Sequence, residues 1–163
     1  MEIRELNRDE LTLITSLAHE IWPITFAEIL STKQIAYMLE WMYNEKQLSS
    51  QHVSGHSFFA LYLNNEAVGF MGVEPNYSGT SALKIQKLYV KPNVHGQGLG
   101  KQFIHFAKQF ALQNNCSSLV LNVNRFNKAV LFYLHLGFTI TREENIAIGN
   151  GFLMEDYVME LKL

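Results

Sequence analysis

The apolar positions at the start of the chain change their spacing from one segment to the next. Residues 1–6 form a short run that is typical of a strand. Residues 7–22 carry apolar side chains three and four positions apart, which predicts an amphipathic helix capped by Asn7 or Asp9. We expect Pro23 to end this helix, because proline has no N–H to donate to the preceding turn.

A second helical region and three strands are expected in the middle of the chain. Residues 31–51 again show helical spacing, and Ser31 or Thr32 can cap the first turn. Residues 57–76 contain two β-rich runs around an Asn-Asn-Glu turn, which indicates a hairpin. Residues 82–92 form a third strand that stops at a proline.

The last third of the chain predicts a crossover followed by a closing hairpin. A glycine-rich turn leads into a helix that lasts to about residue 114. Four elements follow it, namely a buried strand over 117–124, a short helix over 127–137, and strands over 138–149 and 152–163. The order β-α-α-β-β-β-α-β-α-β-β predicts a single α/β fold with a mixed, mostly antiparallel sheet flanked by helices.

Composition restricts the class of protein. With 163 residues, 48% of them hydrophobic, the chain has the size of one globular domain spanning 1–163. A net charge of -2 argues against a nucleic-acid partner, and no apolar run is long enough for a membrane partner. The charged first residues do not resemble a signal peptide. A lone cysteine, Cys116, excludes an internal disulfide, so we expect a cytoplasmic protein, and we expect no metal site.

The glycine-rich segment HGQGLGK, residues 95–101, lies between a strand and a helix, where α/β folds bind ligands. Glycines allow consecutive N–H groups to face an anion, and the start of a helix adds a favourable field. The Walker pattern fails, because residue 95 is not glycine and Gln102 replaces Ser or Thr. The dinucleotide fingerprint fails too, because Lys101 replaces a glycine and Asn122 an acid. A tight turn without a ligand is the alternative.

Two motifs taken together resemble the GCN5-related N-acetyltransferase (GNAT) superfamily. The family's acetyl-CoA loop reads Arg/Gln-x-x-Gly-x-Gly/Ala, and residues 95–100 follow it as HGQGLG. A later family motif has Asn-x-x-Ala, an aromatic pair and Gly-Phe. The matching residues here are Asn127-Lys128-Ala129, which is one residue shorter than Asn-x-x-Ala, then Phe132-Tyr133 and Gly137-Phe138. The resemblance covers residue 57 to the C-terminus. His95 departs from the family's Arg or Gln, which implies weaker attraction for pyrophosphate.

The resemblance implies that residues 1–55 supply a strand and the acceptor-side helices, and that 56–163 form the acetyl-CoA-binding core. The pyrophosphate would rest on the N–H groups of residues 96–101. The pantetheine arm would pair like an added strand with Leu88 and Val90, and the N–H of Leu88 would stabilise the oxyanion. The implied acetyl-CoA-binding residues are Leu88, Tyr89, Val90, His95, Gly96, Gln97, Gly98, Leu99, Gly100, Lys101, Asn122, Asn127 and Tyr133.

The implied activity is transfer of an acetyl group from acetyl-CoA to a primary amine, by direct attack through a tetrahedral intermediate. Tyr133 stands where the family donates a proton to the departing CoA thiolate, and a phenol with a pKa of about 10 can do so at neutral pH. A core tyrosine is the alternative. Asn127 would bond the CoA arm or cap its helix. Asn122 could contact the substrate or a water, but it cannot act as a base.

A base is needed as well, because an alkylamine with a pKa of about 10.4 is protonated at neutral pH. The strand over 82–90 offers lysines and a glutamine but no carboxylate. Glu74, at the end of the preceding strand, is the nearest acid and is our candidate catalytic base, and His56 is another. A water chain that leads to backbone carbonyls is the alternative.

The acceptor is implied to bind beside the two N-terminal helical regions. Trp22 and Phe26 flank the expected break and would form aromatic walls for a cationic or apolar amine, with core packing as the alternative. Glu155 and Asp156 could attract a cationic acceptor or belong to a solvated edge. The acceptor is left open between a small molecule, a polyamine and a peptide amine. A homodimer is left open as well. A non-catalytic acyl-CoA-binding sensor is the competing hypothesis.

Overall fold

A seven-stranded sheet forms the centre of the computed structural model, which describes residues 1–163. The strand order is β1-β2-β3-β4-β5-β7-β6, and only β4 and β5 run parallel. This confirms the predicted mixed, mostly antiparallel sheet. The strands are β1 (Glu2–Glu5), β2 (Ser57–Leu63), β3 (Glu66–Glu74), β4 (Ala82–Val90), β5 (Ser118–Asn124), β6 (Thr139–Gly149) and β7 (Phe152–Lys162).

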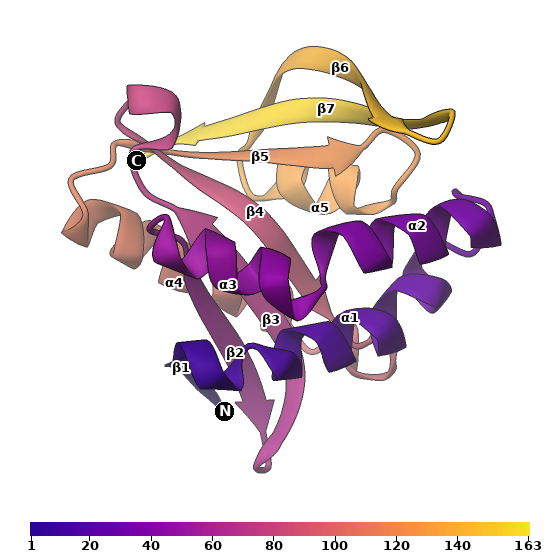
Figure 1. The fold of residues 1–163 in the computed structure, drawn as a ribbon. Coiled ribbons are helices and arrows are strands. Elements are labelled where there is room, and N and C mark those ends of the chain that lie inside the picture. Colours follow the sequence, from indigo (N-terminus) through magenta and orange to yellow (C-terminus); the bar gives the residue numbers. More distant parts are fainter.

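Helices cover both faces of the sheet. Three of them lie on one face in Figure 1, namely α1 (Thr12–Thr25), α2 (Thr32–Met42) and α3 (Glu45–Val53). The opposite face carries α4 (Leu99–Gln113) and α5 (Ala129–His135). None of the helices is long and apolar enough to cross a membrane.

Each face of the sheet has its own hydrophobic core because side chains alternate along a strand. On β2, Phe58 and Ala60 pack with the core of α1 to α3, whereas Phe59 and Leu61 pack with the core of α4 and α5. All four side chains are buried, so the two sets of helices are held on opposite faces by one strand.

Two predictions about the N-terminal helices were wrong. Pro23 lies inside α1, where a proline in the last turn removes only one backbone hydrogen bond, and Phe26 N still donates to Trp22 O at 3.0 Å. The region 31–51 forms two helices, because Asn44 leaves the helical conformation and caps α3 with its side chain. The predicted cap Ser31 is confirmed, since it accepts a hydrogen bond from the Gln34 N–H.

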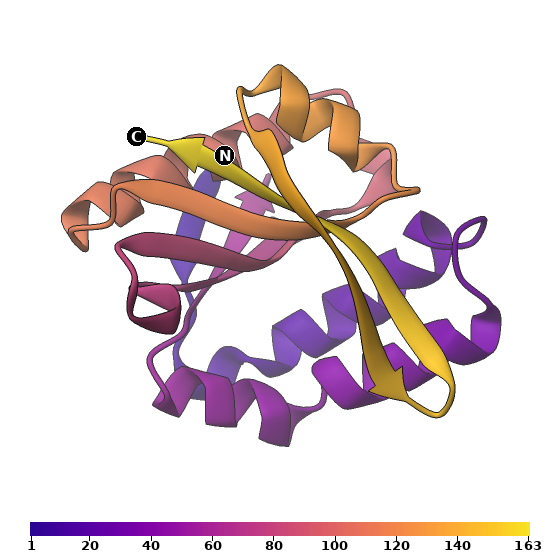
Figure 2. The same ribbon diagram turned by 90° about the horizontal axis from the view of Figure 1, so that it is seen from above.

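The β6–β7 hairpin extends beyond the sheet and crosses α2 (Figure 2). Two contacts hold it there: Tyr37 Oη donates to Ile148 O at 2.6 Å, and Gln34 Nε2 donates to Leu153 O at 2.7 Å. Gly149 permits this approach, because a Cβ at that residue would lie 2.7 Å from the Tyr37 hydroxyl. The hairpin and α2 therefore border the same side of the sheet.

Candidate active site

A gap opens between the two parallel strands at the centre of the sheet. β4 and β5 pair only from Ala82 with Ser118 to Ile85 with Leu121. Beyond this register both strands continue without pairing to each other, and Figure 1 shows them diverging. The gap therefore has a closed end near Ile85 and an open end toward the glycine-rich loop.

The β4 edge of this gap presents backbone groups that β3 does not use, and only the Val90 carbonyl oxygen among them meets a side chain of the protein, His95. Lys91 N donates to Val68 O across β3, so the N–H and C=O groups of Val90 and Leu88 point the other way, into the gap. A bound chain with amide groups can pair with such an edge as an added strand does. Leu88 and Val90 were the two residues predicted to do this.

Six consecutive N–H groups are free at the start of α4. No backbone carbonyl accepts a hydrogen bond from any of residues 96–101, and no side chain caps the helix. Gly96 and Gly98 have φ angles of 82° and 75°, which other residues adopt only with strain, so the glycines are required by the path of the loop. A helix start with unpaired donors and a positive dipole end is an anion site.

His95 ties this loop to the end of β4. Its Nε2 lies 2.8 Å from the carbonyl oxygen of Val90, and a carbonyl only accepts, so Nε2 carries the proton. The side chain therefore does not stand free to meet a phosphate, as an arginine would. Lys101 is exposed on the first turn of α4.

Helix α5 approaches the start of α4 closely because Gly100 has no side chain. A Cβ on Gly100 would lie 3.1 Å from Phe132 Cζ. The next residue, Tyr133, is buried between Phe132 and Phe138 in the α4–α5 core. Burial raises the pKa of the Tyr133 phenol, so it keeps its proton at neutral pH. Asn127 Oδ1 accepts from Ala129 N at 2.9 Å and so caps α5 locally.

Tyr89 lies beside the gap on the α1 side of β4. Burial raises the pKa of its phenol, and the nearby Tyr133 and Asp156 raise it further. Trp22 and Phe26 pack against its ring with centroids 5.5 and 6.2 Å away. Both are buried, so their role as walls of an acceptor pocket stays a prediction. The structure does place both rings against Tyr89, the residue that follows Leu88 on β4.

The two candidate bases touch each other at the closed end of the gap. His56 Nε2 lies 3.2 Å from Glu74 Oε2, and the same oxygen accepts from Gln86 Nε2 at 2.8 Å. Glu74 pairs with Lys84 across β3 and β4. Leu88 is four residues further along β4, or about 13 Å at the rise of a strand. A proton would have to cross that distance through water.

A polar cluster from four strands lies on the same face, and the sequence did not reveal it as a unit. Asn122 Nδ2 donates to Glu144 Oε2 at 3.0 Å and to Asp156 Oδ2 at 3.3 Å, while Lys84 Nζ donates to Asn122 Oδ1. Arg142 binds Glu144 from the solvent side. The only sequence signal was a set of polar residues at alternate positions in strands that read as buried.

Lys87 is the second buried lysine of β4. Its Nζ lies 3.2 Å from Gln51 Oε1 and 5.4 Å from the ring centre of Tyr43. Burial lowers the pKa of Lys87 to about 8, because desolvation disfavours the charged amine. The Tyr43 hydroxyl and Trp22 Nε1 are buried nearby without partners.

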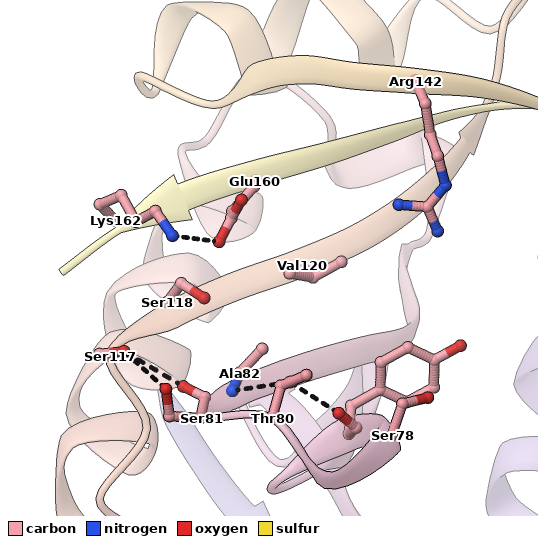
Figure 3. A pocket seen from close by; sticks show the side chains of 11 residues that line it. Ser78, Thr80, Ser81, Ala82, Ser117, Ser118, Val120, Arg142, Glu160 and Lys162 are labelled. Carbon is pink, nitrogen blue, oxygen red and sulfur yellow. Dashed lines mark hydrogen bonds and ion pairs between the residues drawn. The ribbon is translucent and has the colours of Figure 1, made fainter.

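A polar hollow of about 480 Å³ lies at the other end of β4 and β5 (Figure 3). Ala82 and Ser118, the first residues of these strands, line it together with the hydroxyls of Ser81 and Ser117, which are 3.1 Å apart. Its basic residues are already paired, since Lys162 binds Glu160 and Arg142 binds Glu144. The gap and the free N–H groups lie at the opposite ends of the strands.

Comparison with known proteins gives the same family as the motifs. The family model described as acetyltransferase (GNAT) family matches residues 14–138. An uncharacterized N-acetyltransferase of Lactobacillus delbrueckii subsp. lactis is 26% identical over 92% of this chain and 91% of its own. The spermidine N(1)-acetyltransferase of Thermoplasma acidophilum is 26% identical over 95% of this chain and 96% of its own.

Solved structures share the fold. The PaiA N-acetyltransferase of Thermoplasma acidophilum, solved in complex with coenzyme A, superposes with a TM-score of 0.82 at 23% identity, covering 99% of this chain and 98% of that one. The ribosomal-protein-S18-alanine N-acetyltransferase of Escherichia coli gives a TM-score of 0.72 at 18% identity, over 99% and 92%. The likeness extends over the three N-terminal helices and the core.

Proposed function

This chain belongs to the acetyltransferase (GNAT) family and is an acetyl-CoA-dependent N-acetyltransferase, and from this premise we propose how its residues act and on which acceptor. The gap between β4 and β5, with six free N–H groups at its open end, is the observation that carries the proposal. We propose that CoA enters from the α4–α5 side and the amine from the α1–α3 side.

The residues present fit the chemistry of CoA. The N–H groups of 96–101 are unpaired donors for the pyrophosphate, and Lys101 adds a charge from the first turn of α4. The edge of Leu88 and Val90, on which only the Val90 carbonyl oxygen already has a partner, suits the amides of the pantetheine arm. Asn127 keeps its Nδ2 available while Oδ1 caps α5. Acetyl-CoA supplies the activated thioester.

Tyr133 is proposed as the general acid. Its phenol is protonated because burial raises its pKa, and it lies on the α5 side of the gap, where the CoA sulfur would leave. The N–H of Leu88 points into the gap and would stabilise the charge that develops on the thioester oxygen. Acid and oxyanion donor thus come from different elements around one opening.

Glu74 is retained as the candidate base that the sequence predicted. Its contacts with His56 and Gln86 orient the carboxylate. Its place at the closed end means that it would act through water rather than on the amine itself. Asn122, the other polar residue proposed near the substrate, is already bonded to Lys84, Glu144 and Asp156.

A small alkylamine, with polyamines as the first class to examine, is the acceptor we propose. Support comes from the similarity to a spermidine N(1)-acetyltransferase and from three carboxylates, Glu74, Glu144 and Asp156, on the amine face. Trp22 and Phe26 would border the pocket through their contacts with Tyr89. We also propose a cytoplasmic location, which suits a lone buried cysteine, and a homodimer stays a prediction.

A CoA-release assay over a panel of amines tests the proposal. The panel contains spermidine, spermine, a monoamine and a peptide with an N-terminal alanine. We expect turnover with the polyamines, and preferential turnover of the peptide would overturn the acceptor class. CoA binding measured by calorimetry without any release would contradict the catalytic proposal and support a sensor.

A further inference from the structure

A buried carboxylate on the amine face has been given no catalytic role above. Asp156 on β7 is only 6% exposed. The neighbouring β7 side chains Tyr157 and Met159 pack into the α4–α5 core. Because side chains alternate along a strand, Asp156 points to the opposite face, which is the face of Asn122.

The register of the sheet places Asp156 at the level of the expected reaction. The last β4–β5 pair is Ile85 with Leu121, and three residues further lie Leu88 on one strand and Asn124 on the other. Asn124 pairs with Asp156 across β5 and β7. Asp156 is therefore one strand away from the open part of the gap, whereas Glu74 lies at the closed end.

The cluster around Asn122 fixes one oxygen of Asp156 and leaves the other free. Lys84 donates to Asn122 Oδ1, which sets the amide so that Nδ2 faces the carboxylates. Nδ2 then donates to Asp156 Oδ2 at 3.3 Å. Oδ1 has no hydrogen-bond donor in the structure and is not one of the fully buried atoms without a partner, so it is the oxygen of this carboxylate that solvent can reach. A ligand that enters there can therefore donate to it.

Resting on the proposed function, we propose that Asp156 Oδ1 accepts the proton of the attacking amine. The protonated amine first gives one proton to Oδ1, which passes it to solvent, and the neutral nitrogen then forms a bond to the acetyl carbon. As the tetrahedral intermediate collapses, the nitrogen gives its second proton to Oδ1, the carbon–sulfur bond breaks and the CoA sulfur takes a proton from Tyr133. Asp156 releases that second proton to solvent and Tyr133 regains one from solvent, so one net proton is released for each protonated amine consumed.

The surroundings of Asp156 favour a carboxylate that can bind a proton. Burial raises its pKa, and Glu144 on β6 acts in the same direction. The hydrogen bond from Asn122 and the charges of Lys84 and Arg125 oppose this shift without cancelling it. The remaining groups that face the cluster are Arg142, which is bound to Glu144, and Tyr89 of β4.

The test compares Asp156→Asn with Glu74→Gln, using spermidine and acetyl-CoA. We expect Asp156→Asn to lower kcat by roughly 10²-fold or more, the usual size of a general-base contribution, while calorimetry gives the wild-type Kd for CoA. The fall in kcat toward acidic pH that we expect for the wild type should be absent in Asp156→Asn. Formate should restore part of the activity of Asp156→Ala, which a purely structural role would not allow.

A second readout needs no acetyl-CoA. Carboxyl ¹³C NMR of the free protein should show one aspartate that titrates above the ordinary range and is lost in Asp156→Asn. Glu160→Gln is the matched control on the same strand and face, and we expect wild-type kinetics from it. Near wild-type kcat in Asp156→Asn, or loss of kcat only in Glu74→Gln, overturns this inference and leaves the acetyltransferase intact. A wild type that turns over no amine would instead contradict the proposed function.

Discussion

His95 Nε2 lies 2.8 Å from the carbonyl oxygen of Val90, so the first residue of the glycine-rich loop is bonded to the strand edge that faces the gap. This contact links the two surfaces on which CoA would rest. The family's usual arginine or glutamine at this place is thus replaced by a residue that holds the loop in place.

Removal of this contact should weaken CoA binding without harming the fold. We expect His95→Ala to raise the Kd for CoA about five-fold, which corresponds to the loss of one hydrogen bond of about 1 kcal/mol. Calorimetry measures the Kd and thermal denaturation measures stability. Asn93→Ala, which changes an exposed residue just before the loop, is the control. Equal Kd values for the two variants would show that the hydrogen bond from His95 to Val90 does not support CoA binding.

Tyr133→Phe should separate catalysis from binding. We expect kcat to fall by about 10²-fold with an unchanged Kd for CoA, because the ring still fills its place between Phe132 and Phe138. Burial raises the pKa of Tyr133, so the wild type should show no loss of activity from phenol ionisation below about pH 10. Stopped-flow measurement of CoA release across pH checks both, and an unaltered kcat would remove Tyr133 from the mechanism.

Lys87 should make stability depend on pH. Its pKa is about 8 in the folded protein against 10.5 in the unfolded chain, so between these pH values the unfolded state binds more protons. The free energy of unfolding should therefore rise with pH in this window, by roughly 3 kcal/mol at about 1.4 kcal/mol per pKa unit. Burial also lowers the pKa of Lys84, which acts in the same direction.

Urea denaturation at pH 7 to 10 measures this rise. Lys87→Met should be more stable than wild type at pH 7, since it removes a buried charge, and should lose most of the rise. The exposed Lys33→Met serves as the control and should keep the wild-type slope. A wild-type slope in Lys87→Met would show that another group titrates.

The sequence predicted the strands, the crossover and the loop because each depends on local spacing. The left-handed glycines, the Ser31 cap and the alternation on β2 are all local signals. Pro23 was misjudged because a proline in a last turn costs little when Trp22 and Phe26 are buried around it. The break at Asn44 was missed because the apolar spacing continues across it.

The amine face could not be predicted because its contacts join residues that are distant in sequence. The cluster of Lys84, Asn122, Glu144 and Asp156 depends on strand order, and β7 lies between β5 and β6. The hydrogen bond from Tyr37 to Ile148 likewise depends on how far the hairpin extends over α2. Spacing along one strand predicts which face a residue takes, but not the residues it meets.

The left-handed turn at Gly98 gives the sharpest test of the loop. Its φ is 75° and no atom lies within 4 Å of the Cβ that alanine would add, so Gly98→Ala adds backbone strain of about 1 kcal/mol without a clash. Gly79→Ala adds similar strain, at φ 71° and also uncrowded, but far from the loop. Both variants should lose similar thermal stability. Only Gly98→Ala should bind CoA more weakly, by several-fold, because the strained turn changes the direction of the free N–H groups of residues 96–101. Equal Kd values in the two variants would mean that the loop does not hold the pyrophosphate.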